Sequence, residues 1–121
     1  MNIKYIFDKL HIHASNEELY KAYKLFFNTF ASEQRIKILN LLRKNSMNVG
    51  EIAKKSKMSQ TNVSHNIKRL MTCGFINQRV EGKYRYYKLN EKTIRPMLKL
   101  IDHHMNEHCL LIIRNLESKN G

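Results

Sequence analysis

The sequence has little proline, glycine or cysteine and no tryptophan. One proline and four glycines are spread over 121 residues. So few helix-breaking residues favour a chain that is mostly helical. The two cysteines, Cys73 and Cys109, lie far apart and lack the paired spacing of a zinc ribbon, a redox pair or a disulfide framework. We expect both to be reduced and structural, with a soft-ligand or redox role for Cys109 left open.

Long hydrophobic runs are also missing. No apolar stretch approaches the ~20 residues that a membrane span needs, and the N-terminus lacks the apolar core of a signal peptide. A hydrophobic content of 42% is nevertheless too high for a disordered basic tail. We therefore expect one folded domain over residues 1–121, located in the cytoplasm.

Acidic residues are scarce. The chain has 10 Asp and Glu against 22 Lys and Arg, a formal net charge of +12. Residues 59–88 contain six basic and one acidic side chain, whereas residues 89–121 contain five and four. A basic surplus in the middle of the chain favours a polyanionic partner such as DNA or RNA, because each neutralised phosphate releases counterions. The alternative is a basic surface that is simply solvated.

Apolar residues three and four apart predict helices along most of the chain. The first is a short amphipathic helix at residues 3–10. Ser15 followed by Glu18 is typical of a capping box at the start of a second helix. That helix carries a broad stripe, which we expect to lie in the core, formed by Leu19, Tyr20, Tyr23, Phe26, Phe27 and Phe30.

Three further caps predict the helices of the central region. Ser32 is expected to begin a helix that runs to Arg43. Asn48 with Glu51 predicts a very short helix at residues 49–55. Ser59 is expected to cap a longer helix that ends near Thr72, where Gly74 supplies a left-handed residue.

The pattern then changes to a period of two residues. Residues 75–80 and 83–89 are predicted to form a β-hairpin with its turn at Glu81 and Gly82. A long helix is expected over residues 91–116, with Pro96 tolerated in its first turn. The fold class is therefore mainly α with a small β-hairpin.

A short helix, a turn, a second helix and a basic hairpin follow one another in the order of a winged helix-turn-helix, whose second helix enters the major groove of DNA. The candidate DNA-contacting residues are Ser59, Gln60, Thr61, Asn62, Ser64, His65, Lys68 and Arg69 on that helix, and Arg79, Lys83 and Arg85 on the hairpin.

Roles follow from the side-chain chemistry. Gln60 and Asn62 can pair with adenine through two hydrogen bonds. We hypothesise that Gln60, Ser64 and His65 read bases, whereas Lys83 and Arg85 contact phosphates or a narrow groove. Helix capping is the alternative role for Ser59 and Asn62, and packing is the favoured one for the hairpin tyrosines.

Several segments carry a resemblance to a known family. The stretches NVGEIA at residues 48–53, SQTNVSHNIKRL at residues 59–70 and EGKYRYY at residues 81–87 resemble the ArsR/SmtB family of small dimeric repressors. The resemblance implies a homodimeric repressor that binds a palindromic DNA operator. It also implies dimerisation helices within residues 1–30 and 91–117, on either side of a winged core at residues 31–90.

Many members of that family release DNA when a metal binds between their C-terminal helices. The matching positions here are Glu91, Thr93, His104 and Glu107, of which Thr93 is a poor zinc ligand. His108, four residues after His104, could bind the same ion. We list Glu91, His104, Glu107 and His108 as candidate ligands of zinc or another divalent transition metal, with help from His11 or His13. Partly buried interface histidines are the alternative.

Two other functions compete. One is a winged-helix DNA-binding protein without metal sensing, which would respond to a redox signal or a small molecule or would act constitutively. The segment from His104 to His108 also fits the H-x-x-E-H motif of inverted zinc proteases. A zinc hydrolase would need a third ligand and a second lobe, so we expect no enzymatic activity.

Overall fold

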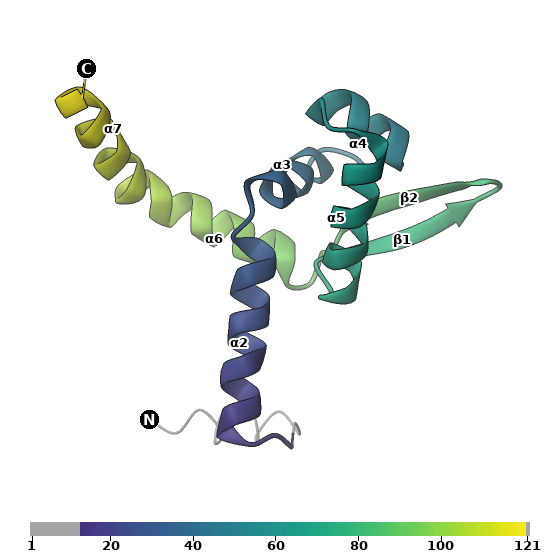
Figure 1. Ribbon diagram of the computed structural model, residues 1–121, viewed down its shortest axis with the longest axis horizontal. Coiled ribbons are helices and arrows are strands. Elements are labelled where there is room, and N and C mark those ends of the chain that lie inside the picture. Colours follow the sequence, from purple (N-terminus) through teal and green to yellow (C-terminus); the bar gives the residue numbers. More distant parts are fainter. Residues whose placement is uncertain (1–12, 121) are drawn as a thin grey trace.

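The computed structural model describes residues 13–120. The helix predicted at residues 3–10, together with His11, lies outside the described residues. Within the described part, α3, α4, α5 and the hairpin form a compact body, from which α2 and the α6–α7 pair extend as two arms (Figure 1). The elements are α2 (Asn16–Phe30), α3 (Glu33–Leu42), α4 (Val49–Ser56), α5 (Gln60–Thr72), β1 (Ile76–Glu81), β2 (Tyr84–Leu89), α6 (Ile94–Glu107) and α7 (Cys109–Asn120).

The predicted caps are confirmed. Ser15 and Asn48 form capping boxes with Glu18 and Glu51 at the starts of α2 and α4. The hydroxyl groups of Ser32 and Ser59 accept backbone N–H bonds from the first turns of α3 and α5. These bonds satisfy amides that a helix start leaves unpaired, so local sequence alone determines where each helix begins.

β1 and β2 pair in antiparallel register, with Ile76 opposite Leu89 and Glu81 opposite Tyr84. The turn was predicted one residue too early: it comprises Gly82 and Lys83, and β1 continues through Glu81. Gly82 has φ +59°, which suits the first position of a tight hairpin turn. A backbone bridge joins the base of the hairpin to the body, because Met47 and Tyr87 exchange N–H···O bonds of 2.9 and 3.1 Å.

One continuous core lies inside the compact body. It is built from α3, α4, α5, the base of the hairpin and the first turns of α6. Its fully buried members are Ile38, Leu39, Leu42, Ile52, Val63, Leu70, Phe75, Ile76 and Leu89. Burial of these side chains supplies most of the driving force for folding the body.

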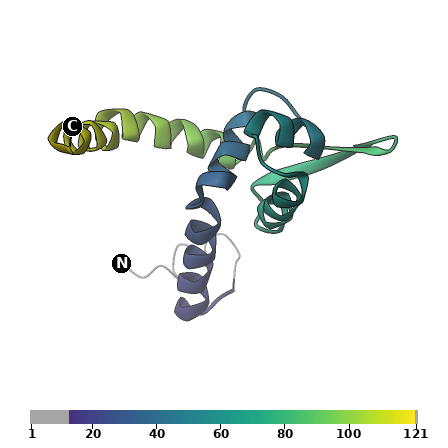
Figure 2. The same cartoon turned by 45° about the horizontal axis from the view of Figure 1, so that its top comes forward.

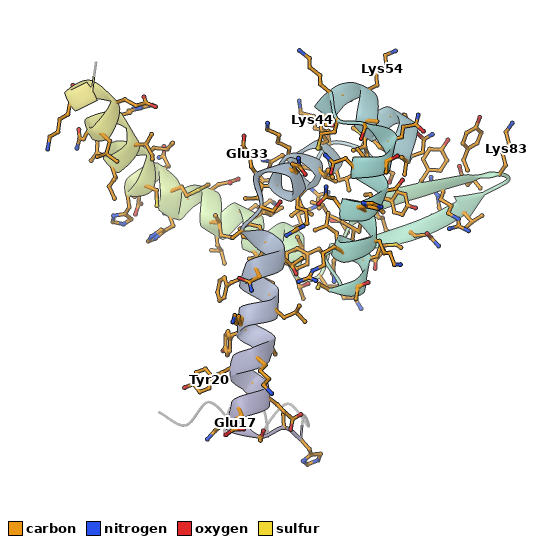
Figure 3. All side chains as sticks on the ribbon, viewed as in Figure 1. Glu17, Tyr20, Glu33, Lys44, Lys54 and Lys83 are labelled. Atoms are coloured by element: carbon orange, nitrogen blue, oxygen red, sulfur yellow. The ribbon has the colours of Figure 1, made fainter. Side chains whose placement is uncertain are left out.

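The aromatic stripe of α2 is only partly in this core, which corrects the prediction. The rings of Phe26 and Phe30 stack on Phe75 with centroids 5.1 and 6.2 Å apart, whereas Leu19 is buried without belonging to this core. Tyr20 and Phe27 are 62% and 57% exposed, and Tyr20 points away from the body (Figure 3). The reason is that α2 meets the body near its C-terminal end and projects away from it (Figure 2).

The C-terminal helix also differs from the prediction of one helix over residues 91–116. α6 begins at Ile94, after a turn in which the Asn90 side chain accepts the backbone N–H groups of Lys92 and Thr93. Pro96 therefore falls in the first turn, as expected. The helix is interrupted at His108 (φ −127°), and α7 continues from there. No glycine or proline marks this interruption in the sequence.

Candidate nucleic-acid interface

Helix α5 presents one side to solvent. Its opposite side is buried through Val63, Ile67 and Leu70. The exposed side consists of side chains that can form hydrogen bonds or carry positive charge, namely Gln60, Thr61, Ser64, His65 and Lys68. Because these positions recur three and four residues apart, they form one continuous strip along the helix.

Two grooves separate α5 from the hairpin. Gln60, Lys83 and Arg85 come together in the first groove, whose other lining residues are Asn48, Val49, Gly50, Tyr84 and Tyr87. Ser64, Lys68 and Arg85 come together in the second, with Val49, Ile67, Met71 and Tyr87. No aspartate or glutamate lines either groove. We call the two together the α5–wing groove.

The two hairpin arginines lie on opposite faces of the ribbon. Residues alternate between faces along a strand, so Arg85 lies on the same face as Tyr87, toward α5. Arg79 pairs with Tyr86 on the other face, where its guanidinium lies 5.6 Å from the Tyr86 ring centroid and 3.4 Å from a Glu81 carboxylate oxygen. Arg79 is therefore not part of the α5–wing groove.

Lys83 occupies the tip of the hairpin, at the end that points away from the body (Figure 3). Its ammonium group lies 5.5 Å from the centroid of the Tyr84 ring. A cation at the end of a projecting ribbon can reach beyond the surface of the body, and a neighbouring ring restricts its motion at little energetic cost.

Two other candidates on α5 face away from the hairpin. The Asn62 side chain accepts a 3.0 Å bond from Asn66, and Arg69 donates a 2.9 Å bond to the Thr29 hydroxyl on α2. Ser59 caps the helix. Of the predicted set, the structure thus gathers Gln60, Ser64, Lys68, Lys83 and Arg85 around one groove, with Thr61 and His65 beside it.

Sequence reasoning missed the polar residues behind α5. Asn66 is 7% exposed and its side chain contacts Gln34 and Arg35 of α3. Thr29 is completely buried. An asparagine or arginine within an amphipathic helix is usually exposed. Nothing in the sequence therefore indicated that Asn66 and Arg35 connect helices.

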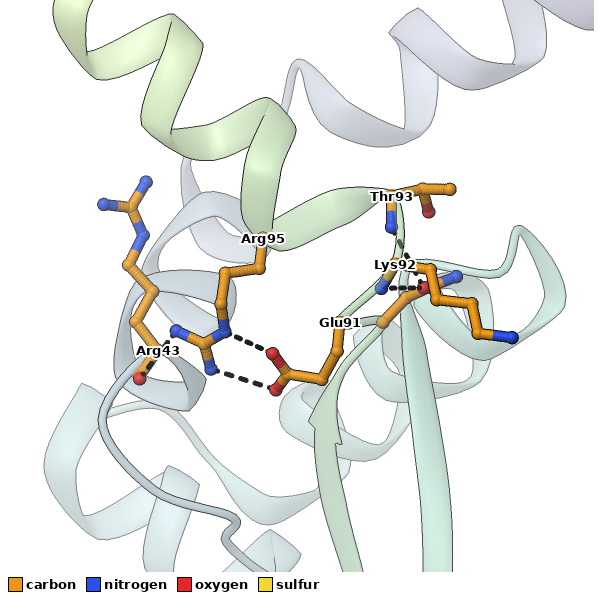
Figure 4. A network of polar contacts seen from close by, with 6 residues as sticks. Arg43, Glu91, Lys92, Thr93 and Arg95 are labelled. Carbon is orange, nitrogen blue, oxygen red and sulfur yellow. Dashed lines mark hydrogen bonds and ion pairs between the residues drawn. The ribbon is translucent and has the colours of Figure 1, made fainter.

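A second polar network joins α3 to α6 (Figure 4). Arg95 donates two bonds to Glu91 and a third, of 3.1 Å, to the Arg43 carbonyl. The hydrogen bond from Arg95 lowers the pKa of Glu91. Asp102 accepts two bonds from the Arg43 guanidinium, of 2.5 and 3.2 Å, and these lower the pKa of its carboxyl group.

The candidate metal ligands do not form a site within one chain. Glu91 is held by Arg95, before α6 begins, whereas His104, Glu107 and His108 lie at the far end of that helix. The rings of His104 and His108 are 4.6 Å apart, and Glu107 lies 3.8 Å from His108. Among residues 13–120, no three His, Cys, Asp or Glu side chains are arranged to hold one ion. The residues described in one chain therefore do not make up a complete metal site.

Comparison with known sequences identifies relatives. The profile described as "Bacterial regulatory protein, arsR family" matches residues 32–78. An uncharacterized HTH-type transcriptional regulator from Methanocaldococcus jannaschii is 31% identical over 86 residues, which cover 70% of this chain and 97% of the relative. The transcriptional repressor SdpR of Bacillus subtilis is 27% identical over 67% of this chain and 90% of its own length. Both relatives are thus named as transcriptional regulators.

Solved structures agree with the sequence matches. A homodimeric winged helix-turn-helix DNA-binding domain from Mycobacterium bovis superposes with a TM-score of 0.71 at 25% identity, over 80% of this chain and 92% of that one. The activator HlyU of Vibrio cholerae in its reduced form gives 0.63 at 26% identity, over 77% and 95%. The order of the elements, the matched profile and the M. jannaschii relative together establish that this chain belongs to the ArsR/SmtB family of winged helix-turn-helix transcriptional regulators.

Proposed function

We propose that this protein is a homodimeric, sequence-specific DNA-binding repressor that acts in the cytoplasm. Gln60, Ser64 and His65 of α5 read base edges in the major groove, and Lys83 and Arg85 of the hairpin bind phosphates. The two protomers place their α5 helices about one turn of DNA apart, and because a two-fold axis relates them, the operator is a palindrome.

The observation that carries this proposal is the composition of the α5–wing groove. Amide, hydroxyl and cationic side chains line it, and carboxylates do not. Such a surface attracts a polyanion, because no fixed negative charge opposes the phosphates. Amides such as Gln60 add hydrogen bonds that distinguish one base pair from another.

Exposed apolar side chains on the two arms support the dimer. On α2, Tyr20 and Phe27 are more than half exposed. On α6 and α7 the exposed apolar residues are Leu100, Met105, Leu110, Leu111, Ile112, Ile113 and Leu116. Large apolar side chains that are exposed in such number along two helical arms favour an interaction site in a folded protein. We infer that residues 91–117, together with residues 1–30, form the interface.

A DNA-binding series tests the assignment of roles. The probes are a duplex selected from a random library by the wild-type protein and a scrambled duplex of equal length. We expect Gln60→Ala to lower the preference for the selected duplex by about tenfold, because a base contact is lost. Lys83→Ala should weaken binding to both probes alike and reduce the slope of log affinity against log salt by about one per protomer.

The control is Lys37→Ala, which removes a lysine that is paired with Glu33 on α3, outside the α5–wing groove. Its affinity for both probes should match the wild type. The role assignment is wrong if Gln60→Ala weakens both probes equally while Lys83→Ala alters only the preference between them.

Metal-dependent release is a second candidate. The observation in its favour is the adjacent pair of imidazole rings on His104 and His108, next to Glu107. Imidazole and carboxylate are ligands that zinc accepts, and a second protomer could supply more. Titration of the dimer with zinc, nickel and cobalt tests this candidate, and a lack of stoichiometric binding would rule it out.

The proposed function is not enzymatic. The same histidines fit the H-x-x-E-H pattern, but a zinc hydrolase requires a third ligand and a substrate cleft. A regulator needs only a DNA-binding surface and a dimer interface.

A further inference from the structure

A guanidinium group connects α2 to α5. Arg35, in the first turn of α3, donates from Nε to the Thr29 carbonyl at 2.6 Å and from one Nη to the Asn28 carbonyl at 3.0 Å. Both carbonyls belong to the last turn of α2, whose oxygens lack helical partners. The other Nη donates to the Asn66 side-chain oxygen at 3.2 Å. One planar side chain thus joins the end of α2 to the middle of α5.

The orientation of Asn66 is determined by its other contacts. Its side-chain nitrogen donates to the Asn62 carbonyl and side-chain oxygen, both at 3.0 Å, and to Gln34 at 3.3 Å. An arginine can only donate hydrogen bonds, so the atom that faces Arg35 must be the oxygen of Asn66. Every polar atom of the Asn66 side chain is therefore paired.

A second contact joins the same two helices nearer the end of α5. The hydroxyl of Thr29 accepts a 2.9 Å bond from Arg69 and lies 3.2 Å from the Cys73 sulfur. Thr29 is completely buried, so solvent does not compete for its hydroxyl. We call Thr29, Arg35, Asn66 and Arg69 the α2–α5 bridge.

Aromatic packing also holds α2 against the body. The rings of Phe26 and Phe30 stack on Phe75. Apolar contacts are non-directional and tolerate small rotations, whereas a planar guanidinium that bonds three oxygens restricts distance and angle together. The bridge therefore determines the angle between α2 and α5 more narrowly than the aromatic contact does.

We propose that the α2–α5 bridge positions α5 relative to the dimer interface. The bridge thereby determines which spacing between operator half-sites the protein accepts. This inference rests on the proposed function, in which α2 contributes to the interface and α5 reads DNA. Arg35 and Thr29 are positioning residues, because Thr29 is buried and Arg35 is occupied by protein oxygens.

The test uses the full chain and a panel of duplexes. The wild-type protein first selects its palindrome from a random library. Duplexes with one or two base pairs inserted or removed at the centre of that palindrome are then titrated with wild type, Arg35→Lys, Thr29→Val and the control Lys37→Gln. Circular dichroism and sedimentation record folding and the oligomeric state. Arg35→Lys keeps the charge but not the planar fork, and Thr29→Val keeps the shape but not the hydroxyl.

We expect both bridge variants to remain folded dimers and to lose about tenfold in discrimination between the native and the altered spacing. Lys37→Gln should keep the wild-type discrimination. A purely structural role would lower the melting temperature and leave the discrimination unchanged, which would overturn the inference. If Arg35→Lys does not fold, Thr29→Val alone decides in the same way.

Failure of the proposed function can be recognised separately. A wild-type protein that selects no palindrome would remove the DNA-binding role and the positioning role together. A wild-type protein with a clear preference for one spacing, which both bridge variants retain, would remove the positioning role alone.

Discussion

Three described residues have a left-handed backbone, and they are not equivalent. Gly74 and Gly82 have φ +75° and +59°, and neither would have a neighbour within 4 Å of an added Cβ. Lys57, which ends α4, has φ 62°. A side chain in this region costs about 1–2 kcal/mol, because Cβ approaches the backbone carbonyl. Lys57 therefore carries a strain that glycine would not have.

This difference predicts opposite effects on stability. Lys57→Gly should raise the free energy of unfolding by roughly 0.5–1 kcal/mol, and Gly74→Ala should lower it by about 1 kcal/mol. Chemical denaturation measures both changes. Gly50→Ala is the matched control, since Gly50 lies in α4 without a positive φ and an added Cβ would come no closer than 3.4 Å to Asn48. A decrease for Lys57→Gly would contradict this explanation.

At the scale of elements, one ion pair and one hydrogen bond connect the end of α3 to α6. Arg43 at the end of α3 binds Asp102 of α6, and Arg95 of α6 binds the Arg43 carbonyl. The pairing lowers the pKa of Asp102, whose side chain is 46% exposed. Solvent screening of such a half-exposed pair limits its contribution to about 0.5–1 kcal/mol.

The pH dependence follows from the direction of that shift. A carboxyl group with a lowered folded-state pKa stabilises the native protein above its unfolded value of about 4, and this stabilisation is lost as the pH falls through the folded value. Asp102→Asn should therefore destabilise the protein at neutral pH and have progressively less effect at acidic pH, below about 4. Thermal unfolding of both proteins across this range measures the difference. An equal destabilisation at both pH values would refute the assignment.

At the scale of the whole molecule, the two arms carry most of the large apolar side chains that are exposed among residues 13–119. Phe27 on α2 and Leu111 on α7 are 57% and 58% exposed. Replacing either with glutamate should leave the fold intact but place a charge in a dry interface. We expect the dimer dissociation constant to rise by about 100-fold or more. Sedimentation velocity measures the change.

Val80, on the hairpin, provides the matched control because it is 60% exposed. Val80→Glu introduces the same charge at a position that belongs to neither arm, so this variant should remain dimeric. A dimer that persists in both arm variants would show that the interface lies elsewhere.

Charge distribution also acts at this scale. A dimer carries twice the +12 of one chain, and residues 89–121 contribute five basic and four acidic side chains to it. A nearly balanced arm can pair with its copy without strong repulsion, while the basic excess of residues 59–88 remains available for phosphates.

None of the helices in the described part of the chain is long and apolar enough to cross a membrane.

Local signals predicted the helices and the hairpin well. Ser15, Asn48 and Ser59 bind the first turns of their own helices, so a few neighbouring residues determine where each helix begins. The start of α6 was predicted three residues too early, because the turn that delays it depends on the Asn90 side chain. The interruption at His108 carried no sequence signal at all.

The candidate site was predictable only as a set of residue types. Periodicity indicated that Gln60, Ser64 and Lys68 share one side of α5, since that depends on helix geometry alone. It could not indicate that Arg85 faces α5 while Arg79 faces away, because the register of the hairpin decides the faces.

By itself, the sequence determined the class of fold, the family and the basic character of the α5–wing groove. Caps, periodicity and charge can be read from residues that are close together along the chain. Only the tertiary structure decided which polar residues meet. Arg35, Thr29 and Asn66 are brought together by the packing of three helices, and the aromatic stripe of α2 is divided between core and solvent by how far that helix extends beyond the body. Contacts between residues distant in sequence depend on the whole packed arrangement, and no local pattern encodes them.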